Sequence, residues 1–186
     1  MSSDKRSNDN GLAWRCAAGL SVVAGLVRLF PYHPPNFTPV GALGLFGGAR
    51  LRPWLAFTLP LAVMAVTDLA LWALRDNPPF NPFVYTSFLV SVLLGRWLLR
   101  KTNAPWRVGA VSLLASVQFF LVTNFGVWAA GRLYPMTPAG LALCYWEGLP
   151  FFGYTVAGDL FFAAVLFGLY ALALHAAERR KAEQPV

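Results

Sequence analysis

The stretch PYHPPNFTPVGALGLFGG spans residues 31–48 and separates two long apolar runs. It holds four prolines, a histidine and an asparagine before it becomes rich in glycine. Its second part, Pro39–Gly48, is apolar but far shorter than the roughly 20 residues that a helix needs to cross a bilayer. Whether this part crosses decides between five and six membrane spans, and therefore whether the two ends of the chain lie on one side.

Composition places the chain in a membrane. Of its 186 residues, 57% are hydrophobic and 12% are charged, and the mean hydropathy is +0.53. Soluble domains are less apolar and carry about twice this share of charge. The sequence predicts one compact membrane domain with long helices at Leu12–Phe30, Trp54–Leu74, Phe83–Leu99, Val108–Ala130 and Thr155–His175.

The basic residues favour counting Pro39–Gly48 as a sixth crossing, because cytoplasmic loops carry the excess of Lys and Arg. With six crossings, one side holds only three of the fifteen basic residues, Arg28, Arg75 and Arg132. The other side holds the remaining twelve: Lys5, Arg6, Arg15, Arg50, Arg52, Arg96, Arg100, Lys101, Arg107, Arg179, Arg180 and Lys181. We therefore expect an all-α bundle of six transmembrane helices with both termini in the cytoplasm.

This topology divides the chain into three parts. Residues 1–10 and 178–186 are expected to be cytoplasmic tails, the first of them disordered, and residues 11–177 form the membrane domain. The net charge of +7 then orients the protein and meets anionic lipids. A nucleic-acid partner is not expected, since the basic residues are divided among short loops and tails. Cys16 and Cys144 fall on opposite sides and cannot pair, and no metal-binding spacing is present.

Polar residues gather in the outer halves of the predicted helices, whereas the inner halves are dry. Ionisable groups in lipid usually face an interior or a cavity, so this distribution predicts a polar outer mouth. The segment LALCYWEGLPFF, residues 141–152, is expected to lie at the outer interface as a short helix that helps to cover the mouth. The predicted ligand contacts are Arg28, His33, Asn36, Asp68, Tyr85 and Asn124, with Trp128 and Tyr145 as flat apolar surfaces.

Each of these residues also has a structural interpretation. Arg28 could snorkel to headgroups or neutralise Asp68 or Asp159, and Asp68 could hold only that arginine. Asp159, expected in the first turns of the last helix, could stabilise its positive end. Other structural roles remain open: Asn124 as interhelical glue, Tyr85 and Trp128 as interface anchors, and His33 as a solvated loop residue.

The first helix carries small residues every four positions, at Ala17, Ser21 and Gly25. Such a stripe lets another helix approach closely, either inside this bundle or in a partner membrane subunit. Catalysis is not expected, since no paired carboxylates, nucleophile elbow or phosphate-binding loop appears. Cys144 and His33 have no identifiable activating partner.

Several motifs together carry a resemblance to a known group of proteins. They are HPPNFTPVGALGLFGGA (33–49), Thr67-Asp68, PFVYTSF (82–88), FFLVTNFGVW (119–128), LCYWEGLPFF (143–152) and GDLFF (158–162). Together they resemble a family of small bacterial membrane proteins, which in turn is similar to the S components of energy-coupling-factor vitamin transporters. The resemblance implies a multi-pass protein of the bacterial inner membrane that binds a vitamin-like molecule near its outer surface. It also implies docking of an energy-coupling subunit through small residues of the first helix.

The nearest named likeness is to BtuM-type cobalamin transporters, whose helix-3 Asp and helix-4 Tyr are matched here by Asp68 and Tyr85. Those proteins have a cysteine in the intervening loop as a cobalt ligand, whereas RDNPPFNPF (75–83) has neither Cys nor His. No resident cofactor is expected, and bound cobalamin would be the transported substrate, either with His33 or Cys144 as the metal ligand or with the cobalt not coordinated by the protein. Neither a pump motif nor an ATP site is present, so energy must come from a partner, trapping or a gradient. The alternative function is a noncatalytic accessory subunit of a larger membrane assembly.

Overall fold

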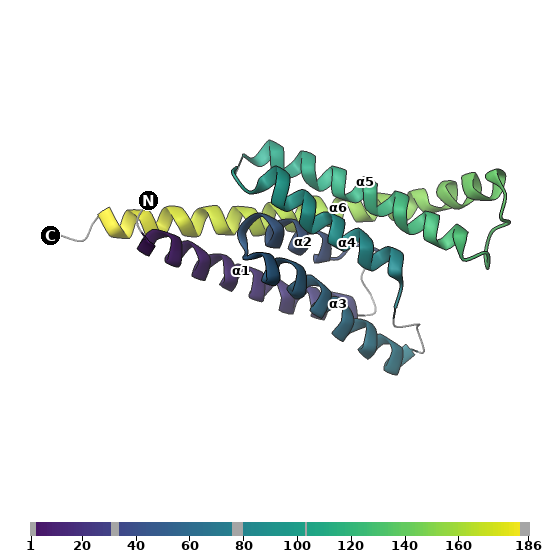
Figure 1. The fold of residues 1–186 in the computed structure, drawn as a ribbon, viewed down its shortest axis with the longest axis horizontal. Helices are drawn as coiled ribbons and strands as arrows, with labels where there is room; N and C mark the ends of the chain where they lie inside the picture. The colour runs from purple at the N-terminus through teal and green to yellow at the C-terminus, as the bar shows by residue number, and fades with distance from the viewer. Residues whose placement is uncertain (1–2, 31–33, 76–79, 103, 183–186) are drawn as a thin grey trace.

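The computed structural model describes residues 3–30, 34–75, 80–102 and 104–182, all of which form helices or their connections (Figure 1). In chain order the elements are α1 (Ser3–Leu29), α2 (Val40–Arg50), α3 (Pro53–Arg75), α4 (Pro82–Leu94), the π-helical turn η1 (Gly95–Leu99), α5 (Pro105–Ala129) and α6 (Pro138–Ala182). No strand occurs in these ranges. The expected all-α class is confirmed.

Five helical stretches in the described chain are long and apolar enough to cross a membrane. They are Gly11–Leu29, Pro53–Leu74, Pro82–Leu99, Pro105–Ala129 and Pro138–Arg179. In the 18-residue apolar window of each span, a third or less of the residues are buried inside the protein. Each span therefore has an apolar face that is free to contact lipid. The chain is therefore a multi-pass helical membrane bundle.

Tryptophans mark the thickness of the membrane on two of these helices. Trp54 and Trp72 lie 18 residues apart on α3, which is about 27 Å of helix at 1.5 Å per residue, and both are more than half exposed. Trp106 and Trp128 lie 22 residues apart on α5, about 33 Å. Tryptophan prefers the membrane interfaces, and a hydrocarbon core is about 30 Å thick. Both intervals therefore fit one bilayer.

The short helix α2 lies at the centre of the bundle. All ten residues from Val40 to Ala49 are buried, and α2 packs against α1, α3, α4, η1, α5 and α6. Eleven residues give only about 16 Å of helix, so the stretch predicted as a sixth crossing is not a lipid-facing span. It is the core helix around which the long helices pack, and its apolar character comes from burial in protein.

Glycines allow α2 to approach its neighbours at backbone distance. A Cβ added at Gly48 would lie 2.9 Å from the backbone nitrogen of Arg96 and would collide with the Val92 carbonyl. A Cβ at Gly95 would collide in the same way with the Leu45 carbonyl. The GALGLFGG run is thus required by close packing between α2 and the α4–η1 region.

Both ends of the chain lie at the same end of the bundle, which we call the terminal end (Figure 1). Although α2 does not face lipid, it carries the chain back inside the protein from the end where α1 stops to the end where α3 begins. The opposite end, where α1 and α3 stop and α4 starts, is called the mouth end. At the terminal end Arg50 donates to the backbone carbonyls of Arg100 and Thr102. Its guanidinium also lies 5.9 and 5.7 Å from the ring centres of Phe167 and Tyr170. Arg50 therefore ties α2, α6 and the connection before α5 together.

The helix ends differ from the sequence prediction in three places. The expected disordered tail is helical from Ser3 onward, and the last helix continues to Ala182, because extending an existing helix is far easier than starting one. The last helix also begins at Pro138 instead of Thr155. The predicted interfacial helix at 141–152 is therefore the first part of α6, which continues through Pro150.

Candidate ligand-binding site

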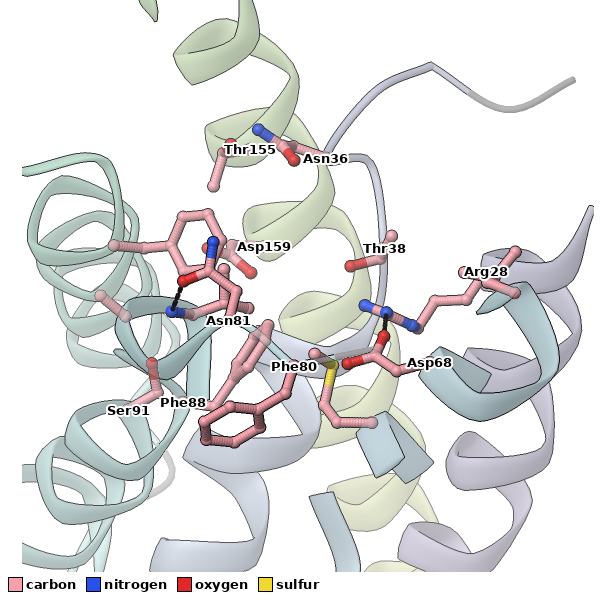
Figure 2. A pocket seen from close by; sticks show the side chains of 16 residues that line it. Arg28, Asn36, Thr38, Asp68, Phe80, Asn81, Phe88, Ser91, Thr155 and Asp159 are labelled. Carbon is pink, nitrogen blue, oxygen red and sulfur yellow. Dashed lines mark hydrogen bonds and ion pairs between the residues drawn. The ribbon is translucent and has the colours of Figure 1, made fainter. Parts of the chain in front are cut away.

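A cavity of about 550 Å³ opens among the helices at the mouth end, and every one of the six α-helices contributes to its wall (Figure 2). Its charged and polar lining residues are Arg28, Asn36, Thr38, Asp68, Asn81, Ser91, Thr155 and Asp159. Its other lining residues are Gly41, Met64, Leu71, Phe80, Val84, Phe88, Ala115 and Phe119. The residue pattern predicted a polar mouth within the apolar bundle, and this cavity is a polar space within it.

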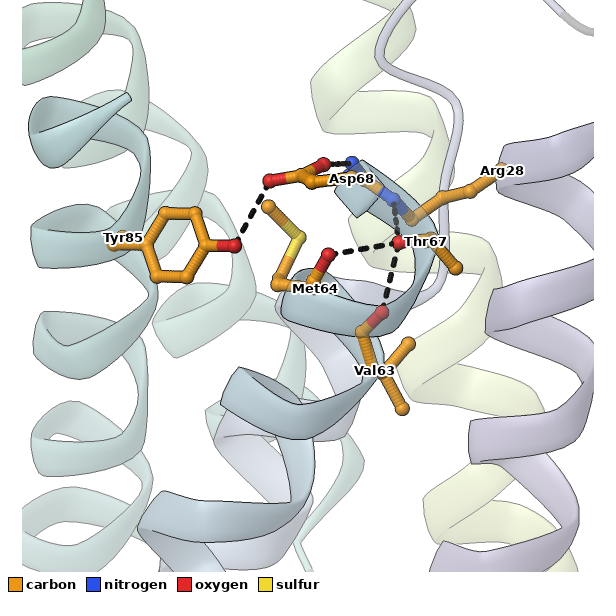
Figure 3. A network of polar contacts seen from close by, with 6 residues as sticks. All are labelled: Arg28, Val63, Met64, Thr67, Asp68 and Tyr85. Carbon is orange, nitrogen blue, oxygen red and sulfur yellow. Dashed lines mark hydrogen bonds and ion pairs between the residues drawn. The ribbon is translucent and has the colours of Figure 1, made fainter. Parts of the chain in front are cut away.

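One side of the cavity is organised around an ion pair between α1 and α3 (Figure 3). Arg28 donates through Nη2 to Asp68 Oδ1 and through Nε to Thr67 Oγ1 at 2.8 Å. Tyr85 on α4 donates its hydroxyl to Asp68 Oδ2 at 2.9 Å. The side chains of Arg28 and Asp68 are only 16% and 14% exposed. Both oxygens of Asp68 are thus occupied within the protein, and its charge is compensated.

Thr67 fixes the arginine in this position. Its hydroxyl accepts from Arg28 and donates to the Val63 carbonyl one turn earlier, at 2.7 Å. Thr67 itself is buried, so the guanidinium is held at two points on α3. The interpretation in which Arg28 neutralises Asp68 is therefore the arrangement that the structure shows, with both groups still lining the cavity.

The irregular segment before α2 forms another part of the wall. Asn36 adopts a left-handed backbone conformation with φ of 60°, which asparagine tolerates better than most residues. Phe37 packs against Phe162 of α6 with ring centres 5.4 Å apart. This contact leaves Asn36 and Thr38 in the cavity lining. Irregular backbone at membrane depth is tolerated where it lines a cavity, and this segment meets that condition.

Asp159 is the most buried charged residue of the polar lining. It sits in the middle of α6, is 6% exposed, and accepts a hydrogen bond of 2.7 Å from Ser116 of α5 through Oδ2. Ser116 lies about 15 Å along α5 from Trp106 and about 18 Å from Trp128, so this pair is near the middle of the membrane. Within the described chain, no Lys, Arg or His side chain forms an ion pair with Asp159.

The expected role of Asp159 at the start of the last helix is therefore wrong. α6 begins 21 residues earlier, at Pro138, and the positive end of a helix acts only over its first turn. Asp159 instead lies beside the first turn of the neighbouring helix α2. A Cβ added at Gly41 would lie 3.0 Å from the Asp159 carboxyl carbon, so Gly41 gives the carboxylate room to approach.

Aromatic rings form the apolar part of the lining. Phe88 and Phe119 stack at a tilt with ring centres 5.4 Å apart, and Phe80 lies 4.9 Å from the Tyr85 ring. These rings come from α4, α5 and the segment before α4. The cavity thus combines flat apolar walls with a few polar groups, which is typical of small-molecule sites.

The cavity brings together four of the eight predicted ligand contacts. Arg28, Asn36 and Asp68 line it, and Tyr85 reaches it through its bond to Asp68. His33 lies outside the described residues, so its position is not assigned.

Three predicted contacts belong elsewhere. Asn124, Trp128 and Tyr145 are absent from the lining and instead connect α5 to α6 or to the segment before it. Tyr145 donates to the Leu121 carbonyl at 2.8 Å, and Trp128 donates to the Pro135 carbonyl at 3.0 Å. Cys144 donates to the Asn124 carbonyl at 3.3 Å. The structure places these residues outside the cavity because α6 begins at Pro138 and packs along α5, where the sequence predicted a short helix that covers the mouth.

The small residues of α1 make contacts inside the bundle. Ala17 is fully buried in the main hydrophobic core. A Cβ added at Gly25 would lie 3.8 Å from the methyl group of Thr67 on α3. Ser21 donates to the Ala17 carbonyl within α1. These contacts favour the interpretation of the stripe as packing inside the bundle. The exposed apolar face of α1 is formed by other residues, among them Val22 and Leu26.

Sequence reasoning missed several lining residues, chiefly Asp159, Thr155, Ser91 and Phe88. For Asp159 a signal existed, since a lone carboxylate within an apolar run is itself a functional indication. The serine, the threonine and the phenylalanine gave no such signal, because these residues are common in any membrane helix.

The comparisons with known proteins give a family. Neither the curated proteins nor the solved structures contain a match to this chain. A family model matches residues 8–183, which is nearly the whole chain and includes every residue of the cavity lining. The chain therefore belongs to DUF6580, a family of unknown function.

Proposed function

We propose that this protein is a membrane uptake protein that binds a vitamin-like small molecule in the cavity at its mouth end and releases it at the terminal end. The observation that carries the proposal is the cavity itself: about 550 Å³ of polar and aromatic-lined space inside an apolar bundle. Polar groups in lipid are costly and are retained where they serve a pathway or a site. Transport alone and transport with an energy-coupling subunit both agree with this cavity.

The distribution of charge supports the direction of transport. The terminal end carries Arg50, Arg52, Arg100, Lys101 and Arg107 in or beside its connections. Basic loops face the cytoplasm, so the terminal end is proposed to be cytoplasmic and the mouth end to face outward in a bacterial inner membrane. Arg50 bridges α2, α6 and the connection before α5 at the terminal end, and the cavity lies at the opposite end, which this proposed orientation makes the outer one.

The volume of the cavity limits the size of the substrate that it can hold. Small-molecule sites usually measure about 300–1,000 Å³, and this cavity lies in the lower half of that range. A complete cobalamin, with its corrin ring and nucleotide loop, is larger than this space. We therefore favour a smaller molecule with one or two rings, and binding of a corrinoid would need the mouth to open.

Native mass spectrometry of the protein, extracted gently from its host membrane, tests the proposal. The expected result is an additional small mass on the wild-type protein that is lost in Asn36→Ala and strongly reduced in Asp68→Asn. Tyr145→Phe is the control, because it removes a side-chain hydrogen bond outside the cavity. Equal occupancy in Asn36→Ala and Tyr145→Phe would contradict the assignment of the cavity as the binding site.

The alternative role as a noncatalytic accessory subunit is favoured by one observation. Arg28, Asp68 and Tyr85 satisfy one another, as a purely structural ion-pair network would. The same spectra separate the two functions. A stable complex with other membrane proteins and no small-molecule mass would support the accessory role.

A further inference from the structure

We propose that the molecule bound in this cavity carries a cationic nitrogen, such as an ammonium group, and that Asp159 is the residue that binds it. This inference rests on the proposed function and specifies the chemistry of its substrate. It follows from the contrast between the two carboxylates of the cavity, from the depth of Asp159 and from the aromatic walls beside it.

The cavity lining has one more negative than positive residue among those described. The charged groups of the cavity lining are Arg28, Asp68 and Asp159. Arg28 and Asp68 form an ion pair with each other, which leaves the carboxylate of Asp159 as the group without a cationic partner in the described part of the lining. A buried charge without a partner is strongly unfavourable. A cation from the outside would complete the site.

Two neighbours stabilise the carboxylate of Asp159. Ser116 donates to Oδ2, and Gly41 in the first turn of α2 lies against the carboxylate. The first N–H groups of a helix have no acceptor within it, and the positive end of the helix dipole favours an anion. α2 has no side-chain cap at this end. Ser116 and α2 therefore stabilise the ionised form that a cation needs, without supplying a full positive charge.

The carboxylate of Asp159 can be reached from the cavity. Asp159 belongs to the cavity lining, and Figure 2 shows its carboxylate directed into the space enclosed with Thr38 and Asn81. Phe88 and Phe119 lie in the same wall, and aromatic faces attract cations by about 0.5–2 kcal/mol. An organic cation can use both the carboxylate and the rings.

The surroundings of Asp159 favour an organic cation over a metal ion. Calcium takes 6–8 oxygen ligands and usually several carboxylates. No group of three or more His, Cys, Asp or Glu side chains in the described residues could hold a metal. One carboxylate with neighbouring hydroxyl groups matches an N–H donor better than a divalent ion.

A matched pair of probes tests the inference on purified protein from which bound molecules have been removed. Benzylammonium carries the charge, and benzyl alcohol has nearly the same size and ring without it. In equilibrium dialysis, wild-type protein should bind benzylammonium at least tenfold more tightly than benzyl alcohol. Asp159→Asn should weaken benzylammonium binding by about tenfold to a hundredfold, as expected for loss of a charge-assisted hydrogen bond, and should leave benzyl alcohol unchanged.

Glu147→Gln is the control, because it removes an acid that is exposed and lies outside the cavity; it should leave both affinities unchanged. The comparison of the two probes on wild-type protein needs no variant, so it stands even if Asp159→Asn folds poorly. Equal binding of the two probes, failure of benzylammonium to bind at millimolar concentration, or undiminished binding in a folded Asp159→Asn would overturn the inference. A copurified molecule that is neutral or anionic would also overturn it while leaving the proposed uptake function intact.

Discussion

Two carboxylates inside the bundle, Asp68 and Asp159, differ in what surrounds them. Asp68 receives an arginine and a tyrosine hydroxyl, whereas Asp159 receives a single serine hydroxyl and lies near the middle of the membrane. The first arrangement stabilises the contact of α1, α3 and α4. The second leaves a carboxyl group without a cationic partner inside a cavity, which is why the two residues are assigned different roles.

The Arg28–Asp68 pair can be measured by a double-substitution cycle. Asp68→Asn should lower the free energy of unfolding by roughly 2–4 kcal/mol, because it leaves a largely buried guanidinium without its counter-charge. Adding Arg28→Gln to this variant should cost less than Arg28→Gln does alone, with a coupling of about 1–3 kcal/mol. Unfolding in mixed detergent micelles gives these values. Strict additivity of the two substitutions would show that the pair contributes nothing to stability.

Tyr134 lies in the connection between α5 and α6. Its hydroxyl donates to Glu147 at 2.7 Å, and this hydrogen bond is the main cause that raises the pKa of Tyr134 from 10.0 to about 12. Because the bond favours the protonated phenol, its contribution to stability is complete below pH 10 and is lost as the pH rises through about 12.

Absorbance of the ionised phenol checks this prediction. The difference between wild-type protein and Tyr134→Phe isolates the titration of Tyr134 from that of the other tyrosines. Glu147→Gln should shift that titration back toward pH 10.0, since the carboxylate acceptor is removed. A midpoint that stays near 12 in Glu147→Gln would mean that another cause raises the pKa.

At the scale of elements, α2 shows how a short helix can organise a membrane bundle. It is too short to cross alone, yet it contacts all five of the other α-helices. Its first turn faces the cavity at Gly41, and its last residue, Arg50, donates to the connection before α5 at the terminal end. A movement of α2 would therefore affect both ends of the proposed pathway.

Glycine substitutions test this packing. Gly48→Ala should destabilise the protein by about 3 kcal/mol or more, because the new Cβ meets the backbone of Val92 and Arg96 and overpacked sites relax poorly. Gly168→Ala on α6 is the matched control. No atom lies within 4 Å of its added Cβ, so it should be neutral or stabilising by up to about 1 kcal/mol through helix propensity. Similar melting temperatures for the two variants would contradict the close approach of α2.

The helix α6 shows a different relation between sequence and structure. Pro150 removes one backbone donor, and the residues around it read as an interfacial segment. The helix nevertheless continues, because contacts to α5 lie on both sides of the proline: Tyr145 with Leu121 before it, and Asp159 with Ser116 after it. Packing against a neighbour thus overrides the local signal.

At the scale of the whole molecule, the proposed orientation places the cavity on the outer side of the membrane. It predicts opposite accessibility for two exposed positions, Lys101 at the terminal end and Met136 at the mouth end. In a variant without the native cysteines, a membrane-impermeant maleimide should label Met136→Cys in intact cells. It should label Lys101→Cys only after the cells are permeabilised. The reverse pattern would place the cavity on the cytoplasmic side and would reverse the proposed direction of transport.

Much of the helical architecture follows from the sequence alone. Long apolar runs bounded by prolines and basic residues determine α3, the α4–η1 segment and α5 to within a few residues, because a bilayer requires about 20 apolar residues per helix. Intramembrane charge predicted Asp68 as an interior group and Arg28 as one of its candidate partners, since such residues are too costly to face lipid. Both inferences depend on local composition and depth, which a sequence contains.

Tertiary structure decided the rest. Whether an apolar segment faces lipid or protein is set by its neighbours, so the role of Pro39–Gly48 as a buried core helix could not be read from its hydropathy. Pairing across helices is likewise set by packing, which joins Arg28 to Asp68, leaves Asp159 with Ser116, and turns Asn124 and Tyr145 toward the α5–α6 contact. The sequence determined which groups must avoid lipid, and only the packing of six helices determined which of them meet.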